Sequence, residues 1–192
     1  MIQYHSLFPT QLVVDSDPGL AEKLLSICDY YVSRSSTNLL QQPNFPSTLY
    51  DNDTTDRVNS DKIVVDALNH IHDFYIRDIM ESRGFDYEKE LFGPPFGFFS
   101  SMKKGALLKK HSHQDCHFSG IIFLEVGKDV PPLTFHDPRP APKFQTEGFK
   151  TKDTIDIWPE EGMIMIWDHW LEHEIMREHY SDDPRKVFSF NI

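Results

Sequence analysis

Cysteine is scarce in this sequence, since only Cys28 and Cys116 occur among 192 residues. Two cysteines so far apart form neither a disulfide framework nor a C-x-x-C metal pair. Long hydrophobic runs are also missing, because no window approaches the roughly 18 apolar residues of a membrane span. The first residues lack the charged start and apolar stretch of a signal peptide. We therefore expect a protein of the reducing cytoplasm that does not enter a membrane.

Basic residues are outnumbered, with 19 Lys and Arg against 30 Asp and Glu and a formal net charge of −11. An acidic surface repels a phosphate backbone, so we expect no nucleic-acid partner. The densest basic cluster comprises Lys103, Lys104, Lys109 and Lys110. A charge cluster of this kind is typical of a solvated strand edge or loop. No coiled-coil pattern indicates an oligomeric state.

The chain changes character near residue 92. Residues 1–92 are expected to form a helical flank that packs on the core and is not an independent domain, and residues 93–192 are expected to form the core. Asp17 and Pro18 supply a cap and a first-turn proline for one helix. A second helix should begin at Ser60 or Asp61 and end before Gly84. The polar stretch 34–59 between them predicts an irregular loop.

The second half predicts short strands separated by glycine and proline turns. Apolar or alternating segments lie at 96–102, 121–126, 133–135, 154–158, 163–167 and 187–190. Seven or so short strands favour a sandwich or barrel. The fold class is therefore α+β but mainly β, with the N-terminal helices packed on one sheet.

The segment His111-Ser-His113-Gln-Asp115 carries the candidate chemistry. In a strand, residues two apart lie on one face, about 6.5 Å apart along the backbone. A metal chelate could therefore use His111 with His113, or His113 with Asp115. A distal ligand must follow, and His169 and His173 are the candidates. A site of two histidines and a third ligand, with open positions, points to non-haem Fe(II), although zinc also binds imidazole.

Arg185 follows His173 by twelve residues and opens the last predicted strand. An arginine buried in a barrel needs an anionic partner, and its planar fork suits a carboxylate. A dicarboxylic co-substrate that chelates iron at one end and pairs with Arg185 at the other fits this order of residues.

Four motifs in order resemble a family of 2-oxoglutarate–Fe(II) oxygenases of bacteria and marine phages that is related to prolyl hydroxylases. The H-x-H at 111–113 with Ser119-Gly-Ile-Ile-Phe-Leu124 is similar to the family's H-x-H…SG-x-x-Y-L. The other three matches are Phe135-His-Asp-Pro-Arg139, the stretch from Gly162 to Trp170-Leu-Glu-His173, and Arg185 through Phe190-Asn191. The resemblance spans nearly the whole chain and is strongest over 105–192.

This resemblance implies a double-stranded β-helix (jelly-roll, cupin-like) core and a dioxygenase that uses Fe(II), 2-oxoglutarate and O2. Carried over by position, it makes His111, His113 and His173 the metal ligands and Arg185 the anchor for 2-oxoglutarate. The substrate is implied to be a small molecule or a peptidyl group such as proline. Two departures stand out. Phe123 replaces the motif's tyrosine, and His169 adds a competing histidine.

Two chelate registers remain. Strand length favours His111 with His113, because a strand expected to begin near Phe118 leaves little room to turn after Asp115. Charge favours Asp115, since a carboxylate would neutralise part of the Fe(II) charge. We adopt His111 and keep Asp115 as the alternative, either as ligand or as a group that orients a histidine.

Arg139, Trp170 and Asn191 are candidates for contact with substrate, although Arg139 would also suit a turn. The three tryptophans, Trp158, Trp167 and Trp170, are more typical of the barrel core than of a substrate cage. His117 and His136 are expected to be structural or to face substrate. The alternative functions are a zinc hydrolase or hydratase, a non-catalytic jelly-roll binding module, and an iron dioxygenase that uses histidines alone and no oxo-acid.

Overall fold

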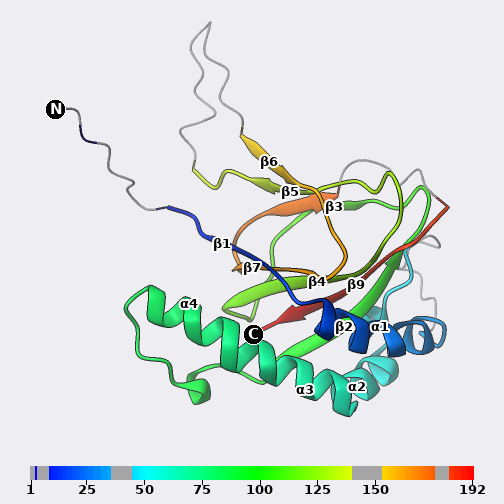
Figure 1. Ribbon diagram of the computed structural model, residues 1–192, viewed down its shortest axis with the longest axis horizontal. Coiled ribbons are helices and arrows are strands. Elements are labelled where there is room, and N and C mark those ends of the chain that lie inside the picture. The colour runs from blue at the N-terminus through cyan, green and yellow to red at the C-terminus, as the bar shows by residue number, and fades with distance from the viewer. Residues whose placement is uncertain (1–2, 4–8, 36–44, 140–152, 176–181) are drawn as a thin grey trace, which may run out of the picture.

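The computed structural model describes residues 3, 9–35, 45–139, 153–175 and 182–192. Two antiparallel sheets face each other (Figure 1). The major sheet has five strands in the order β1-β7-β4-β9-β2, and the minor sheet has four in the order β3-β8-β5-β6. The strands are β1 (Leu12–Ser16), β2 (Phe96–Met102), β3 (Leu108–His111), β4 (Phe118–Val126), β5 (Leu133–His136), β6 (Thr154–Ile157), β7 (Met163–Asp168), β8 (His173–Ile175) and β9 (Arg185–Asn191). This is the double-stranded β-helix that the family resemblance implies.

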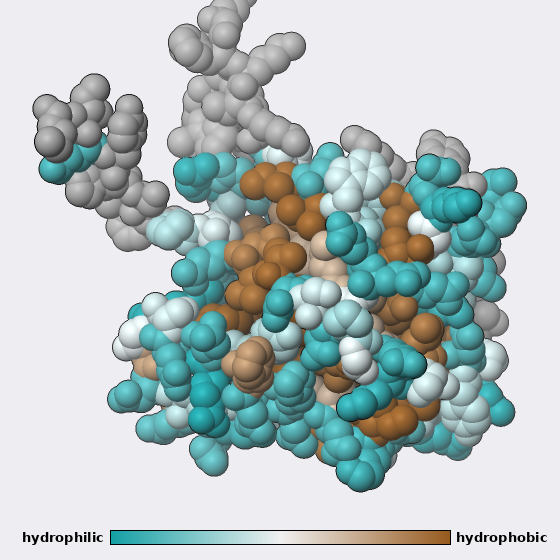
Figure 2. Space-filling model, viewed as in Figure 1, coloured by the Kyte–Doolittle hydropathy of each residue, from teal (hydrophilic) through white to brown (hydrophobic). Residues whose placement is uncertain are grey.

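The helices cover the outer face of the major sheet, as Figure 1 shows. They are α1 (Pro18–Val32), η1 (Thr48–Tyr50), α2 (Asn52–Ser60), α3 (Lys62–His70), the π-helical turn η2 (Ile71–Ile76), α4 (Arg77–Ser82) and η3 (Lys89–Leu91). The Asp17 carboxylate accepts a hydrogen bond from Leu20 N at 2.9 Å, and Pro18 opens α1, as expected. Figure 2 shows hydrophilic side chains over the helices, while hydrophobic ones appear mainly over the strands. No helix among the described residues is long and apolar enough to cross a bilayer.

Both faces of the major sheet are buried, and neighbouring residues on a strand face different cores. Ile122 and Phe188 pack with the helices, whereas Ile121 and Val187 pack between the two sheets. A strand buried on both faces reads as a continuous apolar run, which is why these strands are evident in the sequence.

Gly120 lies where β4 and β9 approach closely. A Cβ atom at this position would overlap the Phe190 ring and would lie 2.8 Å from the Met165 carbonyl oxygen. The Ser-Gly of the sequence motif therefore has a packing reason, because no larger residue fits between these strands.

The N-terminal half differs from the prediction in two places. Residues 34–59 are not all irregular, because α2 begins after an Asp51 cap, and its Asn59 side chain bonds both the N–H and the carbonyl of Gly97 on the edge strand β2. The five residues of β1 were not anticipated, and they extend the major sheet by pairing with β7. Both elements are short and stable only through tertiary contacts, so local propensity hides them.

Candidate active site

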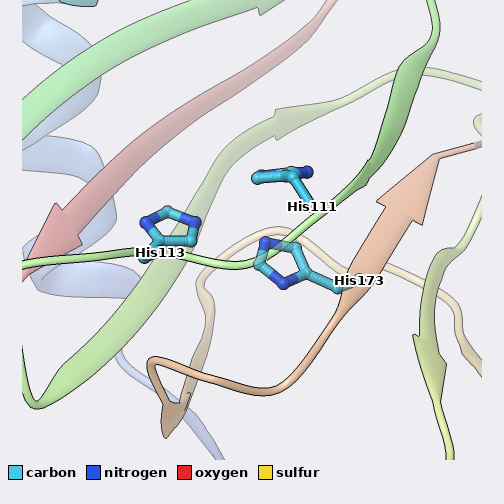
Figure 3. A group of neighbouring side chains, drawn as sticks. All are labelled: His111, His113 and His173. Atoms are coloured by element: carbon cyan, nitrogen blue, oxygen red, sulfur yellow. The ribbon is translucent and has the colours of Figure 1, made fainter.

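Three histidines converge at one end of the minor sheet. His111 closes β3 and His173 opens β8, and the two residues are paired directly in the sheet register. His113 lies just beyond the end of β3. Figure 3 shows the three side chains turned toward one another, and one ligand atom from each lies within 4.8 Å of the others. They are the sole group of this kind among the described residues, and it contains no carboxylate.

Each imidazole is held through its Nδ1 atom. His111 Nδ1 lies 2.8 Å from the Lys109 carbonyl oxygen, and His173 Nδ1 lies 3.0 Å from the Leu171 carbonyl oxygen. His113 Nδ1 lies 2.8 Å from Asn191 Oδ1. All three partners are acceptors, so each Nδ1 carries a proton, and the neutral form of each ring has its lone pair on Nε2. A neutral imidazole with a free Nε2 is the form that a metal requires.

Burial keeps two of these rings neutral. It lowers the pKa of His173 to about 3, with a further lowering from the neighbouring His111. Burial also lowers the pKa of His113, and His111 again contributes. The cause is that a charged imidazole loses its hydration in the apolar interior. At neutral pH these two side chains are therefore in the state that donates to a metal.

His169 supports the group without joining it. His113 N donates to the His169 carbonyl oxygen at 2.9 Å, and His169 Nδ1 lies 3.1 Å from the His113 carbonyl oxygen. These two reciprocal bonds tie the segment after β3 to the segment after β7. The preceding Asp168 forms a two-point ion pair with Arg83 at 2.7 and 3.2 Å, which anchors the end of β7 to the helical layer.

Asp115 lies apart from the three histidines. The expectation that His111, His113 and Asp115 lie on one strand face is wrong, because β3 ends at His111. Asp115 is exposed, has a φ angle of 60°, and lines a second cavity of about 450 Å³ beside Cys116 and His117. The left-handed bend turns the chain within the few residues between His113 and β4.

Arg185 is the largest fully buried side chain, with 2% of its surface exposed. Its Nη1 donates to the Pro131 carbonyl oxygen at 3.0 Å, and its Nη2 lies 3.0 Å from Met102 Sδ. Its Nε has no hydrogen-bond partner, and among the described residues no carboxylate pairs with this guanidinium. Burial lowers its pKa to about 10. A buried cation with a spare donor indicates a site for an anion.

One cavity of about 510 Å³ contains both features. The three histidines and Arg185 line it, together with apolar residues of both sheets such as Leu133. Residues 45–50 of the N-terminal half also form part of its wall, which the sequence did not indicate. The donor set fits an iron ion, and the unpartnered guanidinium fits the far end of a dicarboxylate in the same space.

Several other predicted residues lie elsewhere. Arg139 is exposed and pairs with Asp137, whose pKa it lowers to about 2. Trp170 is 45% exposed and lines a different cavity, and Trp158 is also exposed. Of the three tryptophans, Trp167 is buried in the core as expected. His136 Nε2 lies 3.0 Å from Glu174 Oε1 on the minor sheet, and the exposed His117 packs its ring against Phe92.

Asn191 borders the cavity, but its side-chain oxygen is already engaged. Oδ1 accepts from His113 Nδ1 and also from Ser119 Oγ at 3.1 Å. No pattern in the sequence indicates this role directly, although Ser119 and Asn191 both fall inside the motifs described above.

Part of the sequence matches the model of a known protein family. Residues 98–191 match the family described as "Putative 2OG-Fe(II) oxygenase". Comparison of the sequence with curated proteins gives no match.

Solved structures share the fold at low sequence identity. A Pseudomonas putida prolyl-4-hydroxylase is 12% identical with a TM-score of 0.61, over 95% of this chain and 92% of that one. EvdO2 from Micromonospora carbonacea var. aurantiaca complexed with 2-oxoglutarate is 12% identical with a TM-score of 0.60, over 94% and 85%. AtDAO1, a dioxygenase for auxin oxidation from Arabidopsis thaliana, is 13% identical with a TM-score of 0.54, over 91% and 78%.

Proposed function

The chain belongs to the family of 2-oxoglutarate–Fe(II) oxygenases, and from this premise we propose that His111, His113 and His173 bind the iron and that Arg185 binds the distal carboxylate of 2-oxoglutarate. The protein is a 2-oxoglutarate- and Fe(II)-dependent dioxygenase, and we infer that it hydroxylates its substrate. Asp115 has no part in this proposal, because it faces another cavity.

One observation carries the co-substrate assignment: the unpartnered Nε of Arg185 lies in the wall of the cavity that the three histidines line. A buried guanidinium without an anion is costly, and a carboxylate that accepts from Nε and Nη would satisfy it. A zinc hydrolase or a histidine-only iron dioxygenase would leave this group without a role. Phe123, which stands where the family motif has tyrosine, lies under the guanidinium at 5.9 Å and offers no hydroxyl, so we assign the anchoring to Arg185.

The chain's own residues then have distinct tasks. The Lys109 and Leu171 carbonyl oxygens and Asn191 Oδ1 fix the three imidazole tautomers so that each Nε2 points into the cavity. Buried apolar side chains such as Ile121 and Trp167 exclude water from the reacting centre. When bound, iron with 2-oxoglutarate and O2 supplies the oxidising chemistry, and the protein supplies orientation.

The flank and the core are proposed to fold as one unit, with residues 1–92 packed on 93–192. Side chains of α1 and α3 share a hydrophobic core with β4 and β9, which supports this arrangement. We also propose a cytoplasmic location, supported by Cys28 and Cys116, which are both free thiols. A peptidyl proline is one candidate substrate because one structural neighbour is a prolyl-4-hydroxylase.

The decisive experiment is anaerobic titration of the purified protein with Fe(II) and then 2-oxoglutarate. Wild type should bind one iron and then develop the weak visible band of a metal–oxo-acid chelate. His173→Ala should bind no iron, whereas Arg185→Ala should bind iron but require at least about tenfold more 2-oxoglutarate, since a charge-assisted bond contributes roughly 1.5–3 kcal/mol. An Arg185→Ala protein with wild-type affinity for 2-oxoglutarate would refute the co-substrate assignment.

A further inference from the structure

The cavity has a charge opposite to that of the whole chain. The formal net charge is −11, yet no aspartate or glutamate is among the described residues that line the 510 Å³ cavity. Three cationic side chains do line it: Arg185 inside, and Lys109 and Lys110 on β3 at the exposed rim. A positively charged cavity in a negatively charged protein raises the local concentration of anionic ligands.

The two lysines differ in what they contact. Lys110 Nζ forms an ion pair with Glu172 Oε2 at 2.9 Å, which offsets its charge. Lys109 has no ion pair or side-chain hydrogen bond with any described residue. Its Nζ is therefore the available cation of the rim, because Arg185 is assigned to the co-substrate.

The bound cofactors would not cancel this charge, if the proposed function holds. Three neutral histidines add no negative charge to a divalent iron, and the 2-oxoglutarate dianion balances the iron. Arg185 and Lys109 then leave the cavity positive. A site in which an aspartate replaced one histidine ligand would be one charge less positive. In this protein the nearby Asp115 lies outside the cavity.

Part of the apolar wall comes from outside the family-matched region. Phe45, Leu49 and Tyr50 line the cavity, as does Phe98 of β2. This wall is fixed to β2, since Ser101 N donates to the Pro46 carbonyl oxygen at 2.9 Å and Ser100 Oγ donates to Ser47 Oγ at 2.8 Å. It can therefore present a defined apolar surface to a substrate.

We propose that the substrate is a small molecule with an apolar body and a carboxylate, in which Lys109 receives the carboxylate and Phe45, Leu49 and Tyr50 hold the body. A single lysine on a flexible stem suits a monoanion, whereas a phosphate would call for a fork of donors. The cavity must also hold 2-oxoglutarate, which limits the substrate to small-molecule size. This inference rests on the proposed function. It assigns a substrate-binding role to Lys109, a member of the basic cluster that was expected to be a solvated strand edge or loop.

The test compares matched acids and amides on the anaerobic complex with Fe(II) and 2-oxoglutarate. The probes are 3-phenylpropionate, hexanoate and their primary amides, and binding is followed by the change in the visible band. Both acids should bind at least about tenfold more tightly than their amides, as expected when one charge-assisted hydrogen bond is lost. Leu49→Ala should weaken the binding of 3-phenylpropionate and of its amide by a similar factor, because the substitution removes apolar surface from the cavity wall.

The matched variants are Lys109→Glu and Lys103→Glu, which make the same charge change on and off the cavity. Lys109→Glu should weaken binding of the acids about tenfold or more and leave binding of the amides unchanged. Lys103→Glu should alter either by less than about twofold, since Lys103 is exposed and does not line the cavity, and salt screens exposed charges. Equal binding of acids and amides, or equal effects of the two variants, would overturn the inference. A wild-type protein that forms no visible band would instead overturn the proposed function, so the two failures are distinguishable.

Discussion

The Nδ1 atom of His113 lies 2.8 Å from Oδ1 of Asn191, a residue 78 positions further along the chain. The same oxygen accepts a hydrogen bond from Ser119 Oγ. His111 and His173 are fixed by the sheet and by nearby backbone carbonyls, whereas His113 lies beyond the end of β3 and is oriented from β9. The position of this proposed ligand therefore depends on a side chain.

Asn191→Ala should weaken metal binding by about 10- to 100-fold, the usual effect of removing the partner that orients a ligating histidine. Asn191→Asp should retain most of the affinity because it keeps an acceptor at the same place. Ser189→Ala is the control, since Ser189 lies two residues earlier on β9 and lines the same cavity. Metal titration and thermal unfolding should be measured together. A loss of affinity in Asn191→Ala that Asn191→Asp does not restore would argue against this orienting role.

His169 should prove to be a supporting residue and not a ligand. His169→Ala should still bind one metal ion but release it a few-fold faster, because the His113 backbone loses one of its two bonds to this segment. His169→Asn should restore wild-type release, since its amide nitrogen can donate to the same carbonyl. Stopped-flow transfer of iron to a chelator measures the rates. If His169→Ala binds no metal while His173→Ala does, the distal assignment must be reversed.

The strands of the core could be predicted because a buried strand has apolar or alternating residues that are evident in a short stretch of sequence. The segment Phe96–Met102 was expected as a strand with the bounds that the structure gives it, and the apolar run at 121–126 forms most of β4. In contrast, α2 is polar and β1 has only five residues. Their stability comes from contacts with β2 and β7, which no local window contains.

The site could be predicted in part. The order of His111, His113, His173 and Arg185 along the chain pointed to one site, and the structure brings these residues to one cavity. The bond between His113 and Asn191 joins residues too distant for any spacing argument. The strand face expected for His111, His113 and Asp115 was wrong for a local reason. The end of β3 at His111 and the left-handed bend at Asp115 have no signature in the sequence beyond an aspartate that tolerates such a bend.

His72 should make the protein less stable as the pH falls. Burial, with a smaller contribution from Lys89, lowers its pKa, and its ring contacts the Tyr87 hydroxyl and packs against Phe92. The unfolded chain takes up a proton near pH 6.5 while the folded protein does so at lower pH. The unfolded state therefore binds more protons below about pH 6.5, and the free energy of unfolding decreases there.

Replacing this group should remove its part of the pH dependence. In His72→Gln, the slope of the free energy of unfolding between about pH 6.5 and pH 5 should be smaller, by at most one proton or about 1.4 kcal/mol per pH unit. Denaturant unfolding of the metal-free protein at several pH values measures it, with pH 8 as the reference at which the imidazole is neutral in both states. An unchanged slope would show that His72 is protonated equally in the folded and unfolded protein.

Arg185→Met should separate stability from co-substrate binding. Arginine at this position keeps its charge in an apolar interior without a carboxylate partner among the described residues, so replacing it with an apolar side chain of similar length removes a desolvation cost. The loss of the bond to the Pro131 carbonyl oxygen offsets part of this gain. We expect the ligand-free variant to have a free energy of unfolding within about 1 kcal/mol of wild type, or higher. In the presence of iron and of 2-oxoglutarate at a hundred times its wild-type Kd, wild type should gain about 2.7 kcal/mol, whereas a variant that binds at least about tenfold more weakly should gain about 1.4 kcal/mol or less. Arg185→Lys should fall between the two, because an ammonium supplies the charge without the fork.

Thermal unfolding with and without 2-oxoglutarate measures both effects. A ligand-free Arg185→Met protein destabilised by several kcal/mol would assign the buried guanidinium to the fold, and a variant that 2-oxoglutarate stabilises as much as wild type would place the anchor elsewhere.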